Sequence, residues 1–547
     1  MTRLNTAQVL VQSLIAHGID TLYCLPGVQN DPFFDALYHH TDRLRPIHAR
    51  HEQGAAYMAL GAALATGRPQ VFCVVPGPGF LNAGAALATA YATSAPVLAL
   101  VGQIPSAMIG RGFGLLHEIP DQLSALRGLT KWAERVSGAQ ETAVHAVAAF
   151  RQMASGRPRP AGLEIPMDVW ARDAQFEAPI APVAPEEPSI DDDAVEAAAR
   201  LLGAAERPLI MVGAGAQDAS GEIAAVAGLL QAPVGAYRGG RGVLDSRHPL
   251  SINLPLAHRL WASADAVLAV GTRLQQPQQI WGLDAGIKVV RIDADPEELN
   301  RFRPPAVGIA ARAAPALRKL INALSRHNRR RRPRTDAMMA LKEGHARELA
   351  AHLAPQIAFI EAIRAELPED GIFVDELTQI GYVSRIALPV YRPRTFLSSG
   401  YQGTLGWGLA AALGAKLARP EAPVLAVAGD GGFLFNVQEL ASAVRHRVAV
   451  VTIVFNDGQY GNVRMFQEQN FGGRFIATDL ANPDFAKLAE SFGVAGLRAD
   501  SPAELRAALR RAFALDAPAV IEVRCGEMPS PWPFIQLPRA RPVPDAR

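Results

Sequence analysis

Short runs of consecutive apolar residues alternate along the chain with longer segments in which apolar residues recur every three or four positions. Short apolar runs are typical of strands that are buried on both faces, and the longer pattern is typical of amphipathic helices. The alternation continues from end to end, which predicts an α/β protein built on doubly wound parallel sheets. At 547 residues the chain is too long for one core and predicts about three domains.

Two unusual segments divide this pattern. Residues Glu177–Pro188 contain four prolines and predict an extended, solvated connector. Residues Ser325–Thr335 are strongly basic, and we expect a solvated strap between domains, with anion binding as the alternative. The predicted domains are an N-terminal domain at 1–173, a central Rossmann-like domain at 190–324 and a C-terminal domain at 341–530, followed by a proline-rich tail at 531–547 that either closes over a site or is loosely packed.

The segment Val71–Gly110 contains no charged residue, so a membrane span is the obvious alternative to a buried core segment. Its prolines and glycines divide it into pieces that are too short to cross a bilayer. We therefore expect two buried parallel strands with a loop and a helix between them.

Composition narrows the class of protein. The formal net charge of +2 gives no sign of a nucleic-acid surface. The three cysteines lie far apart, which argues against a zinc cluster and a disulfide scaffold. The N-terminus has the pattern of an amphipathic helix and lacks the features of a signal peptide. Together these observations favour a cytoplasmic protein without a membrane or nucleic-acid partner.

The most specific segment runs from Val424 to Asn462. A buried strand ends in Gly429-Asp430-Gly431-Gly432, and a second buried strand ends in Asn456-Asp457-Gly458-Gln459. Parallel neighbours bring their carboxyl ends to one edge of the sheet, so we expect Asp430 and Asp457 to lie side by side. Carboxylate oxygens suit a magnesium ion that bridges a diphosphate, and the glycines allow close approach of a phosphate. Two ordinary strand-end turns rich in Asp and Gly are the alternative.

This segment resembles the thiamine-diphosphate motif, GDG followed 25–30 residues later by NN, of the acetolactate synthase and 2-oxo-acid decarboxylase superfamily, which includes benzoylformate decarboxylase-like enzymes. The resemblance implies thiamine diphosphate and Mg²⁺ as cofactors, with Asp430, Asp457 and the carbonyl of Gln459 as metal ligands. Asp457 stands where the family has Asn. The resemblance also implies a pyrimidine-binding N-terminal domain and a diphosphate-binding C-terminal domain. It assigns cofactor contacts to Pro26, Gly27, Glu376, Thr378, Gln379, Gly403, Leu405, Gly429, Gly431, Gly432 and Tyr460.

The sequence ARHEQGAAYMALGAALATG (49–67) resembles the family's RHEQGAAHMAEGYARATG, and Glu52 falls on its catalytic glutamate. That glutamate binds N1′ of the cofactor's pyrimidine and so favours removal of the C2 proton. A helix N-terminal acid that only interacts with the helix dipole is the alternative. In the family this glutamate and the metal site belong to different subunits, which implies a homodimer or homotetramer.

Other loops at the predicted rim resemble the family less closely. Gln103 lies in a Gly-Gln-Ile-Pro turn and is a candidate catalytic group, with a surface turn as the alternative. The following loop is about three residues longer than in acetolactate synthases, and its His117 and Glu118 are a candidate proton-donor pair. A structural or solvated His117 remains open. Phe466 occupies the place of a large tryptophan that shapes the acceptor pocket.

The leading hypothesis is an acetolactate synthase-like transferase or lyase, which decarboxylates a 2-oxo acid and transfers the resulting enamine to a carbonyl acceptor. The alternatives are a simple 2-oxo-acid decarboxylase, a lyase for hydroxy-ketones or 2-hydroxyacyl-CoA, and a catalytically silent homologue. FAD binding is doubtful. The central Gly213-Ala-Gly215-Ala turn lacks a third glycine, and the chain has no GMHG-like segment.

Overall fold

The structure is a computed structural model that describes residues 2–176, 181–182 and 187–542. The predicted connector Glu177–Pro188 lies largely outside the described residues. Contacts divide the chain into two compact units. The first comprises 1–186, 399–499 and 508–524, and the second comprises 187–398, 500–507 and 525–547.

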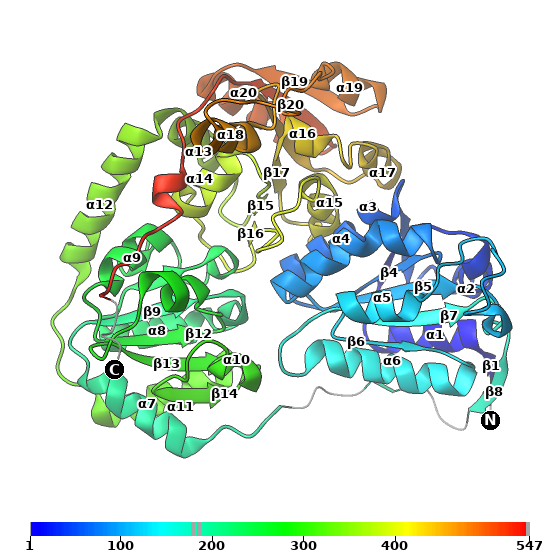
Figure 1. Cartoon of the computed structure of the whole chain (residues 1–547), viewed down its shortest axis with the longest axis horizontal. Helices are drawn as coiled ribbons and strands as arrows, with labels where there is room; N and C mark the ends of the chain where they lie inside the picture. Colours follow the sequence, from blue (N-terminus) through cyan, green and yellow to red (C-terminus); the bar gives the residue numbers. More distant parts are fainter. Residues whose placement is uncertain (1, 177–180, 183–186, 543–547) are drawn as a thin grey trace. The chain divides into compact units, whose positions relative to one another are not determined.

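Three parallel sheets form the framework, as the apolar runs predict. The first sheet belongs to the first unit and has the strand order β3-β2-β4-β5-β7-β6. Helices α1, α2 and α6 pack on one of its faces, and α3 and α4 lie on the other (Figure 1). The strands are β2 (Thr21–Cys24), β3 (Arg45–His48), β4 (Gln70–Val74), β5 (Val97–Gln103), β6 (Trp132–Arg135) and β7 (Ala161–Pro166); the helices are α1 (Thr6–Ala16), α2 (Asp31–Tyr38), α3 (Glu52–Thr66), α4 (Pro78–Thr93), α5 (Gln122–Leu129) and α6 (Ala139–Ala154).

The charge-free segment Val71–Gly110 forms strand β4, helix α4 and strand β5, with both strands almost fully buried. This confirms the prediction of two buried strands around a helix. In the described part of the chain, no helix has the length and apolar character that a membrane crossing requires.

The first unit also contains four neighbouring parallel strands of a second sheet, in the order β17-β18-β20-β19. Its helix α15 crosses α3 at very short range, because Gly61 and Gly414 have no side chains at the crossing. The elements are β17 (Val424–Gly429), β18 (Val451–Asn456), β19 (Ala495–Ala499), β20 (Ala519–Arg524), α15 (Gly408–Ala418), α16 (Asp430–Phe433), α17 (Glu439–His446), α18 (Gly461–Phe471), α19 (Phe485–Ser491) and α20 (Pro502–Ala514), of which the residues up to Ala507 are assigned to the second unit.

The second unit has a six-stranded parallel sheet in the order β11-β10-β9-β12-β13-β14. Helices α7, α8 and α11 pack on one face, and α9 packs on the other. The bounds are β9 (Pro208–Val212), β10 (Val234–Ala236), β11 (Ser251–Ile252), β12 (Ala266–Val270), β13 (Lys288–Asp293), β14 (Val307–Ala310), α7 (Asp192–Ala204), α8 (Ser220–Leu230), α9 (Leu254–Trp261) and α11 (Ala313–His327). Also in this unit are β15 (Ile372–Val374), β16 (Phe396–Leu397), α12 (Thr335–His352), α13 (Ala354–Glu366) and α14 (Gln379–Ala387).

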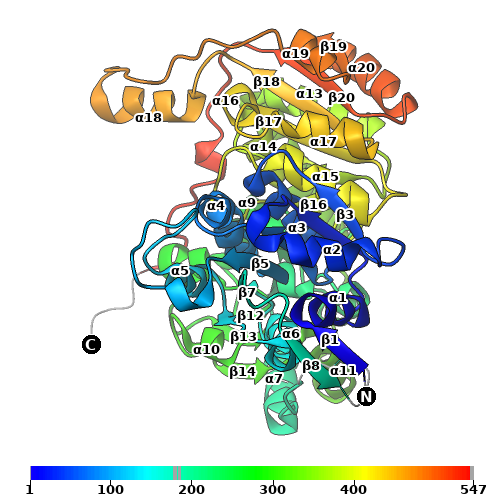
Figure 2. The same cartoon turned by 90° about the vertical axis from the view of Figure 1, so that its right-hand side faces the viewer.

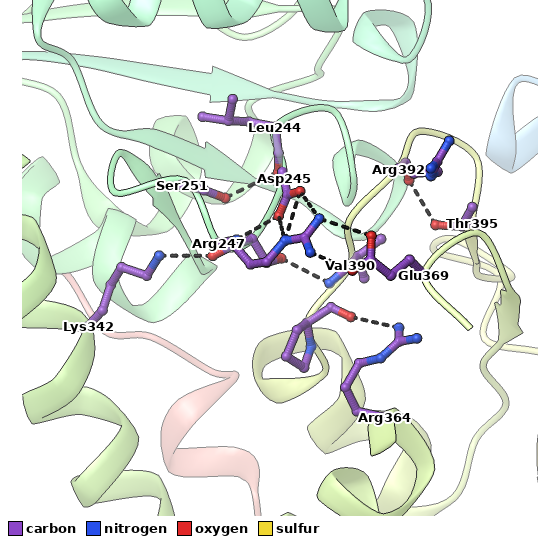
Figure 3. A network of polar contacts seen from close by, with 12 residues as sticks. Leu244, Asp245, Arg247, Ser251, Lys342, Arg364, Glu369, Val390, Arg392 and Thr395 are labelled. Atoms are coloured by element: carbon purple, nitrogen blue, oxygen red, sulfur yellow. Dashed lines mark hydrogen bonds and ion pairs between the residues drawn. The ribbon is translucent and has the colours of Figure 1, made fainter. Parts of the chain in front are cut away.

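A polar network joins the six-stranded sheet of the second unit to its later helices (Figure 3). Arg247 pairs with Asp245 and with Glu369, which follows α13. The ammonium group of Lys342 on α12 donates to the carbonyl oxygens of Ser246 and His248 at 2.9 and 3.1 Å. These contacts fix the loop after β10 against α12 and the segment after α13.

The basic segment Ser325–Thr335 is more firmly attached than a solvated strap. Arg331 is only partly exposed and donates to the carbonyl oxygens of Leu202 and Ala205. Arg326 pairs with Glu196 on α7. Glu196 in the first half of α7 and carbonyl groups at the end of α7 therefore hold this segment, which sequence patterning alone does not reveal.

The described part of the proline-rich tail also packs within the second unit. Arg541 is 6% exposed, binds the carboxylate of Asp284 and donates to the carbonyl oxygens of Trp261 and Ala264. The alternative of a loosely packed tail is therefore wrong for residues up to Arg541.

Candidate functional site

Asp430 and Asp457 follow two strands whose ends are in register. Strands β17 and β18 are parallel neighbours, with Gly429 opposite Phe455, so both acids emerge at the same edge of the sheet. The backbone N–H of Gly458 donates to Asp430 Oδ2 at 2.9 Å and thereby ties the second turn to the first acid. The structure thus brings together the two acids that the sequence predicts.

The two carboxylates disfavour each other's charge. Burial raises the pKa of Asp430, and burial together with the negative charge of Asp430 raises the pKa of Asp457 to about 6. A hard divalent cation would relieve both effects. No group of three or more His, Cys, Asp or Glu suited to a metal is found among the described residues. Two carboxylates at one sheet edge fit an ion such as Mg²⁺, because it prefers oxygen ligands, keeps few protein ligands and takes its other oxygens from phosphate and water.

The neighbouring residues form a close-packed turn. A Cβ atom on Gly431 would lie 2.5 Å from the ring of Tyr460, so only glycine fits beneath this ring. Gln459 hydrogen-bonds to Asp457, and it forms an isolated bridge with Asp479. Gly431, Tyr460 and Gln459 thus lie beside the acidic pair, while their contacts with cofactor and metal stay predictions.

Asn482 is a site residue that the sequence analysis missed. Its amide donates to Asp430 Oδ2 at 2.6 Å and to the side-chain oxygen of Asn456 at 3.0 Å. Asn456 in turn donates to the buried carboxylate of Glu522. Asn482 lies 52 positions after Asp430 in a segment without a motif, so no sequence signal pointed to it.

The segment with Gly403 and Leu405 lies in the same unit and beside the first turn. Gly403 has a φ of +56°, which favours glycine, and Leu405 is partly buried. The side chain of Asn436 donates to the carbonyl oxygen of Gly406 at 2.6 Å. The hydroxyl groups of Thr404 and Tyr57 are 3.1 Å apart, which links this segment to α3.

Glu52 is the first residue of α3. The side chain of Asn82 on α4 donates to Glu52 Oε2 at 3.0 Å and orients the carboxylate. The start of the helix is fixed by Glu439, whose carboxylate accepts hydrogen bonds from the backbone N–H groups of Arg50 and His51. Glu439 is fully buried and was not predicted, because its role depends on the contact between α3 and α17.

The predicted rim residues of the first sheet differ in burial and in how many of their polar atoms are already hydrogen-bonded. Gln103 is 3% exposed, its amide group donates to Glu164, and its oxygen accepts from the N–H of Ile104. His117 is partly exposed, and its ring hydrogen bond within the described part of the chain is the one from Nδ1 to Gln29. Glu118 accepts from the backbone of its own loop. This geometry favours a supporting role for Gln103, while the catalytic roles of Gln103 and His117 stay predictions.

The remaining predicted contacts lie on two different units. Pro26 and Gly27 follow β2 in the first unit, and a Cβ atom on Gly27 would lie 2.5 Å from a methyl group of Val75. The second unit holds Glu376, Thr378 and Gln379, which lie between β15 and the first turn of α14. The roles of these five residues in cofactor binding stay predictions.

Comparison with known families decides the class of protein. The C-terminal, N-terminal and central domains of the thiamine pyrophosphate enzymes match residues 379–523, 4–125 and 195–320. The region matched by the C-terminal domain contains the acidic pair, and the region matched by the N-terminal domain contains Glu52. The chain belongs to the thiamine pyrophosphate enzymes.

Individual members of the family match along almost the whole chain. A probable 2-ketoarginine decarboxylase of Pseudomonas aeruginosa is 33% identical over 95% of this chain and 94% of its own length. A probable acetolactate synthase large subunit of Methanocaldococcus jannaschii is 31% identical over 94% of this chain and 91% of its own. The acetolactate synthase isozyme 1 large subunit of Escherichia coli is 30% identical over 97% of this chain and 96% of its own. This thiamine pyrophosphate enzyme is therefore similar to acetolactate synthases and to a decarboxylase.

The central domain of this thiamine pyrophosphate enzyme carries the Gly-Ala-Gly-Ala turn that resembles a dinucleotide site. Gly213 and Gly215 pack directly against Gly271 of the next strand end, with no space for a Cβ atom. Their N–H groups donate to the carbonyl oxygens of Val270 and Gly271. These two glycines therefore serve close packing between β9 and β12, and their N–H groups are already used.

Proposed function

We propose that this chain is a Mg²⁺- and thiamine-diphosphate-dependent enzyme that decarboxylates a 2-oxo acid and joins the remaining fragment to a second carbonyl compound. The observation that carries the proposal is the acidic pair Asp430 and Asp457 at one sheet edge, in a chain that also has Glu52 at the start of α3. The similarity to acetolactate synthase large subunits over nearly the whole chain supports the carboligation step.

The residues of the C-terminal turns would hold the cofactor. Asp430 and Asp457 would bind Mg²⁺, and Asn482 would keep Asp430 oriented through its 2.6 Å hydrogen bond. The carbonyl of Gln459 would be the third protein ligand. Gly429, Gly431 and Gly432 would leave room for the diphosphate. When bound, thiamine diphosphate supplies the electron sink for the charge left by loss of CO₂.

Glu52 would manage the proton at N1′ of the cofactor's pyrimidine. Its carboxylate is held by Asn82, and the start of α3 is held by Glu439, so the group is fixed before any ligand binds. A positioned acid of this kind typically contributes a factor of about 10²–10⁴ to a rate. The rim residues His117 and Gln103 would act on the substrate side, directly or by supporting the loop.

A homodimer or a homotetramer would complete the site. The loops around it expose large apolar side chains, each 37–75% exposed in the single chain: Val28, Leu81, Phe113, Leu116, Leu434, Phe435, Phe471 and Ile476. Helix α18, which follows the second acidic turn, has no buried residue and projects from its sheet (Figure 2). Exposed apolar side chains in this number favour coverage by a second copy of the chain.

The test is a titration of purified protein with Mg²⁺ and thiamine diphosphate, followed by the circular-dichroism band of the bound cofactor. Turnover is then measured with pyruvate, longer 2-oxo acids and aromatic 2-oxo acids. We expect Glu52→Gln to retain cofactor binding and to lose turnover about 10²–10⁴-fold. The exposed Glu490→Gln is the matched control and should behave like the wild type. Absence of cofactor binding in the wild type, or full turnover in Glu52→Gln, would overturn the proposal.

A simple decarboxylase is the second candidate, because the 2-ketoarginine decarboxylase is similar over 95% of this chain. The two functions differ in their products. A carboligase forms one molecule of hydroxy-ketone or acetohydroxy acid for each CO₂ that it releases. A decarboxylase releases one free aldehyde for each CO₂. Product analysis with each 2-oxo acid, with and without an added carbonyl acceptor, separates them. 2-Oxo acids with a guanidinium group belong in this panel.

The proposed activity does not require FAD. The N–H groups of Gly213 and Gly215 already donate hydrogen bonds to backbone carbonyl oxygens at the end of β12, so they are not available to a flavin's diphosphate. Purified protein should therefore lack a flavin absorption spectrum and should turn over without added FAD. A yellow enzyme whose activity depends on FAD would contradict this part of the proposal.

A further inference from the structure

His117 stands in a backbone conformation that the surrounding turns impose. Its φ of +69° is uncommon for a residue with a side chain. The carbonyl oxygen of His117 would lie 2.4 Å from a Cβ atom on Gly77, whose own φ is +57°. His117 is thus strained and packs against a glycine that has no side chain to obstruct it, and such strain persists only where neighbouring contacts hold it.

The turn that contacts His117 also reaches Glu52. Gly79 follows Gly77 in this turn, and a Cβ atom on Gly79 would lie 3.4 Å from Glu52 Oε1. The N–H of Gly77 is bound by the side chain of Gln122 at 2.8 Å. One short turn thus lies between the candidate activating acid and the histidine and keeps both at the same edge of the first sheet.

The side chain of Gln29 determines which ring nitrogen of His117 carries the hydrogen. Its amide nitrogen lies 3.2 Å from the carbonyl oxygen of Leu116, and its amide oxygen lies 3.2 Å from His117 Nδ1. A carbonyl oxygen can only accept, so the NH₂ end of Gln29 must face Leu116. The oxygen end then faces Nδ1, and because this oxygen also only accepts, Nδ1 must carry a hydrogen.

The position of Gln29 is itself well determined. Gln29 is 2% exposed, and its backbone carbonyl oxygen accepts a hydrogen bond from the indole N–H of Trp170 at 2.9 Å. The side-chain amide is bonded at its nitrogen to Leu116 and at its oxygen to His117, so it cannot rotate by 180° without losing both hydrogen bonds. Within the described residues, the hydrogen bond of the His117 ring is made by Nδ1, which leaves Nε2 as the nitrogen open to a ligand.

We propose that Gln29 is a positioning residue that holds His117 in the Nδ1–H tautomer, so that Nε2 accepts and returns a proton on the substrate side. The neutral imidazole takes one proton at Nε2 from a substrate hydroxyl group and becomes an imidazolium. It later returns the same proton to the substrate side and is again neutral, so no other reactant is needed. Only this proton step rests on the proposed function; the tautomer itself does not.

The tautomer is measured without substrate or cofactor. The chain has 13 histidines, so ¹⁵N-histidine labelling gives a limited set of signals, and His117→Gln assigns those of His117. We expect a protonated Nδ1 and an unprotonated Nε2 at a pH where the ring is neutral. In Gln29→Met, which keeps the volume but has no acceptor, the Nε2–H form should appear. A wild-type His117 already in the Nε2–H form would overturn the proposal.

Two variants separate the tautomer from a merely structural role. Gln29→Met and Gln29→Glu both lose the donor to Leu116, but only Gln29→Glu keeps an acceptor for Nδ1–H. We expect Gln29→Met to lower kcat about 10–100-fold with little change in KM, and Gln29→Glu to retain most of kcat. An equal loss in both variants would show that only the bond to Leu116 matters and would overturn the proposal. The exposed His39→Gln should leave activity unchanged. If wild-type protein has no turnover at all, the proposed function fails while the tautomer measurement still stands.

Discussion

At the scale of single residues, the turns after β17 and β18 hold two carboxylates whose charged forms are disfavoured. Asp430 is buried and Asp457 is half-buried. Hydrogen bonds from Gly431, Gly458 and Asn482 partly compensate Asp430, and hydrogen bonds from Gln459 partly compensate Asp457. At Asp457 the negative charge of Asp430 adds to the effect of burial, and the pKa is raised to about 6. Asp457, at the position where the family motif has Asn, therefore carries a charge that either protonation or a bound cation would neutralise.

Asp457→Asn should stabilise the metal-free protein at neutral pH. In the folded protein the pKa of Asp457 is raised to about 6, first by burial and then by Asp430, above its ordinary value of 3.8. The folded state therefore binds more protons between these two values, so the stability of the metal-free wild type falls as pH rises through this window. Removing the group should add on the order of 1–2 kcal/mol at pH 7.5, after allowance for solvent screening, and nothing below the ordinary pKa.

The measurement is the Tm of both proteins in EDTA at several pH values from about 4 to 7.5. The difference between them should grow with pH. Excess Mg²⁺ and thiamine diphosphate should raise the Tm of the wild type more than that of the variant, because the bound cation neutralises the carboxylate. A difference that does not depend on pH would contradict the assigned cause.

At the scale of elements, the contact between α3 and α15 requires glycine on both helices. A Cβ atom at Gly61 would lie 1.9 Å from the carbonyl oxygen of Ala411, and one at Gly414 would lie 1.8 Å from that of Met58. Gly61→Ala should therefore separate the helices and lower the free energy of unfolding by about 3 kcal/mol or more. Because α3 begins with Glu52, turnover should fall as well.

Gly228→Ala on α8 is the matched control, because nothing lies within 4 Å of its Cβ position. A helical glycine in open space should gain up to about 1 kcal/mol on replacement by alanine. Denaturant unfolding of both variants gives the comparison. Equal stability of the two variants would show that the crossing tolerates a methyl group.

The C-terminal tail is held within the second unit mainly through Arg541. Arg541→Ala leaves the carboxylate of Asp284 and two carbonyl oxygens without this donor and should cost about 1–3 kcal/mol. The tail should then be cut earlier in limited proteolysis. The exposed Arg539→Ala removes the same charge nearby and should leave the cleavage pattern unchanged. Unchanged cleavage in Arg541→Ala would mean that other tail contacts are sufficient.

Sequence patterning predicts the elements of this chain better than their contacts. The charge-free segment forms the expected strands and helix, because apolar runs determine burial directly. The acidic pair was also predictable, since both acids directly follow buried parallel strands. Asn482 and Glu439 were not, because each contributes one hydrogen-bonding side chain from a distant element. The attachment of Arg331 and Arg541 was missed because charge and proline content indicate solvation and cannot identify a carbonyl partner.

At the scale of the whole molecule, the two halves of the proposed chemistry lie on different parts of the chain. Glu52 begins helix α3, which packs on the first sheet, and the acidic pair belongs to the turns after β17 and β18. The exposed apolar residues of the site loops lie on both parts. A second copy that covers them would bury these side chains and would bring its own acidic turns with it.

If one site takes Glu52 from one chain and the acidic pair from another, two inactive variants should restore each other. Glu52→Gln and Asp430→Asn chains with different tags are produced together, and the mixed dimers are isolated by successive purification on both tags. Each mixed dimer then has one site with both substitutions and one intact site, so it should show about half of the wild-type activity. Dimers of one variant alone should show almost none. If both groups came from the same chain, every site in the mixed dimer would carry a substitution, and no activity would return. A single-chain molecular mass in light scattering at assay concentrations would contradict the shared site directly.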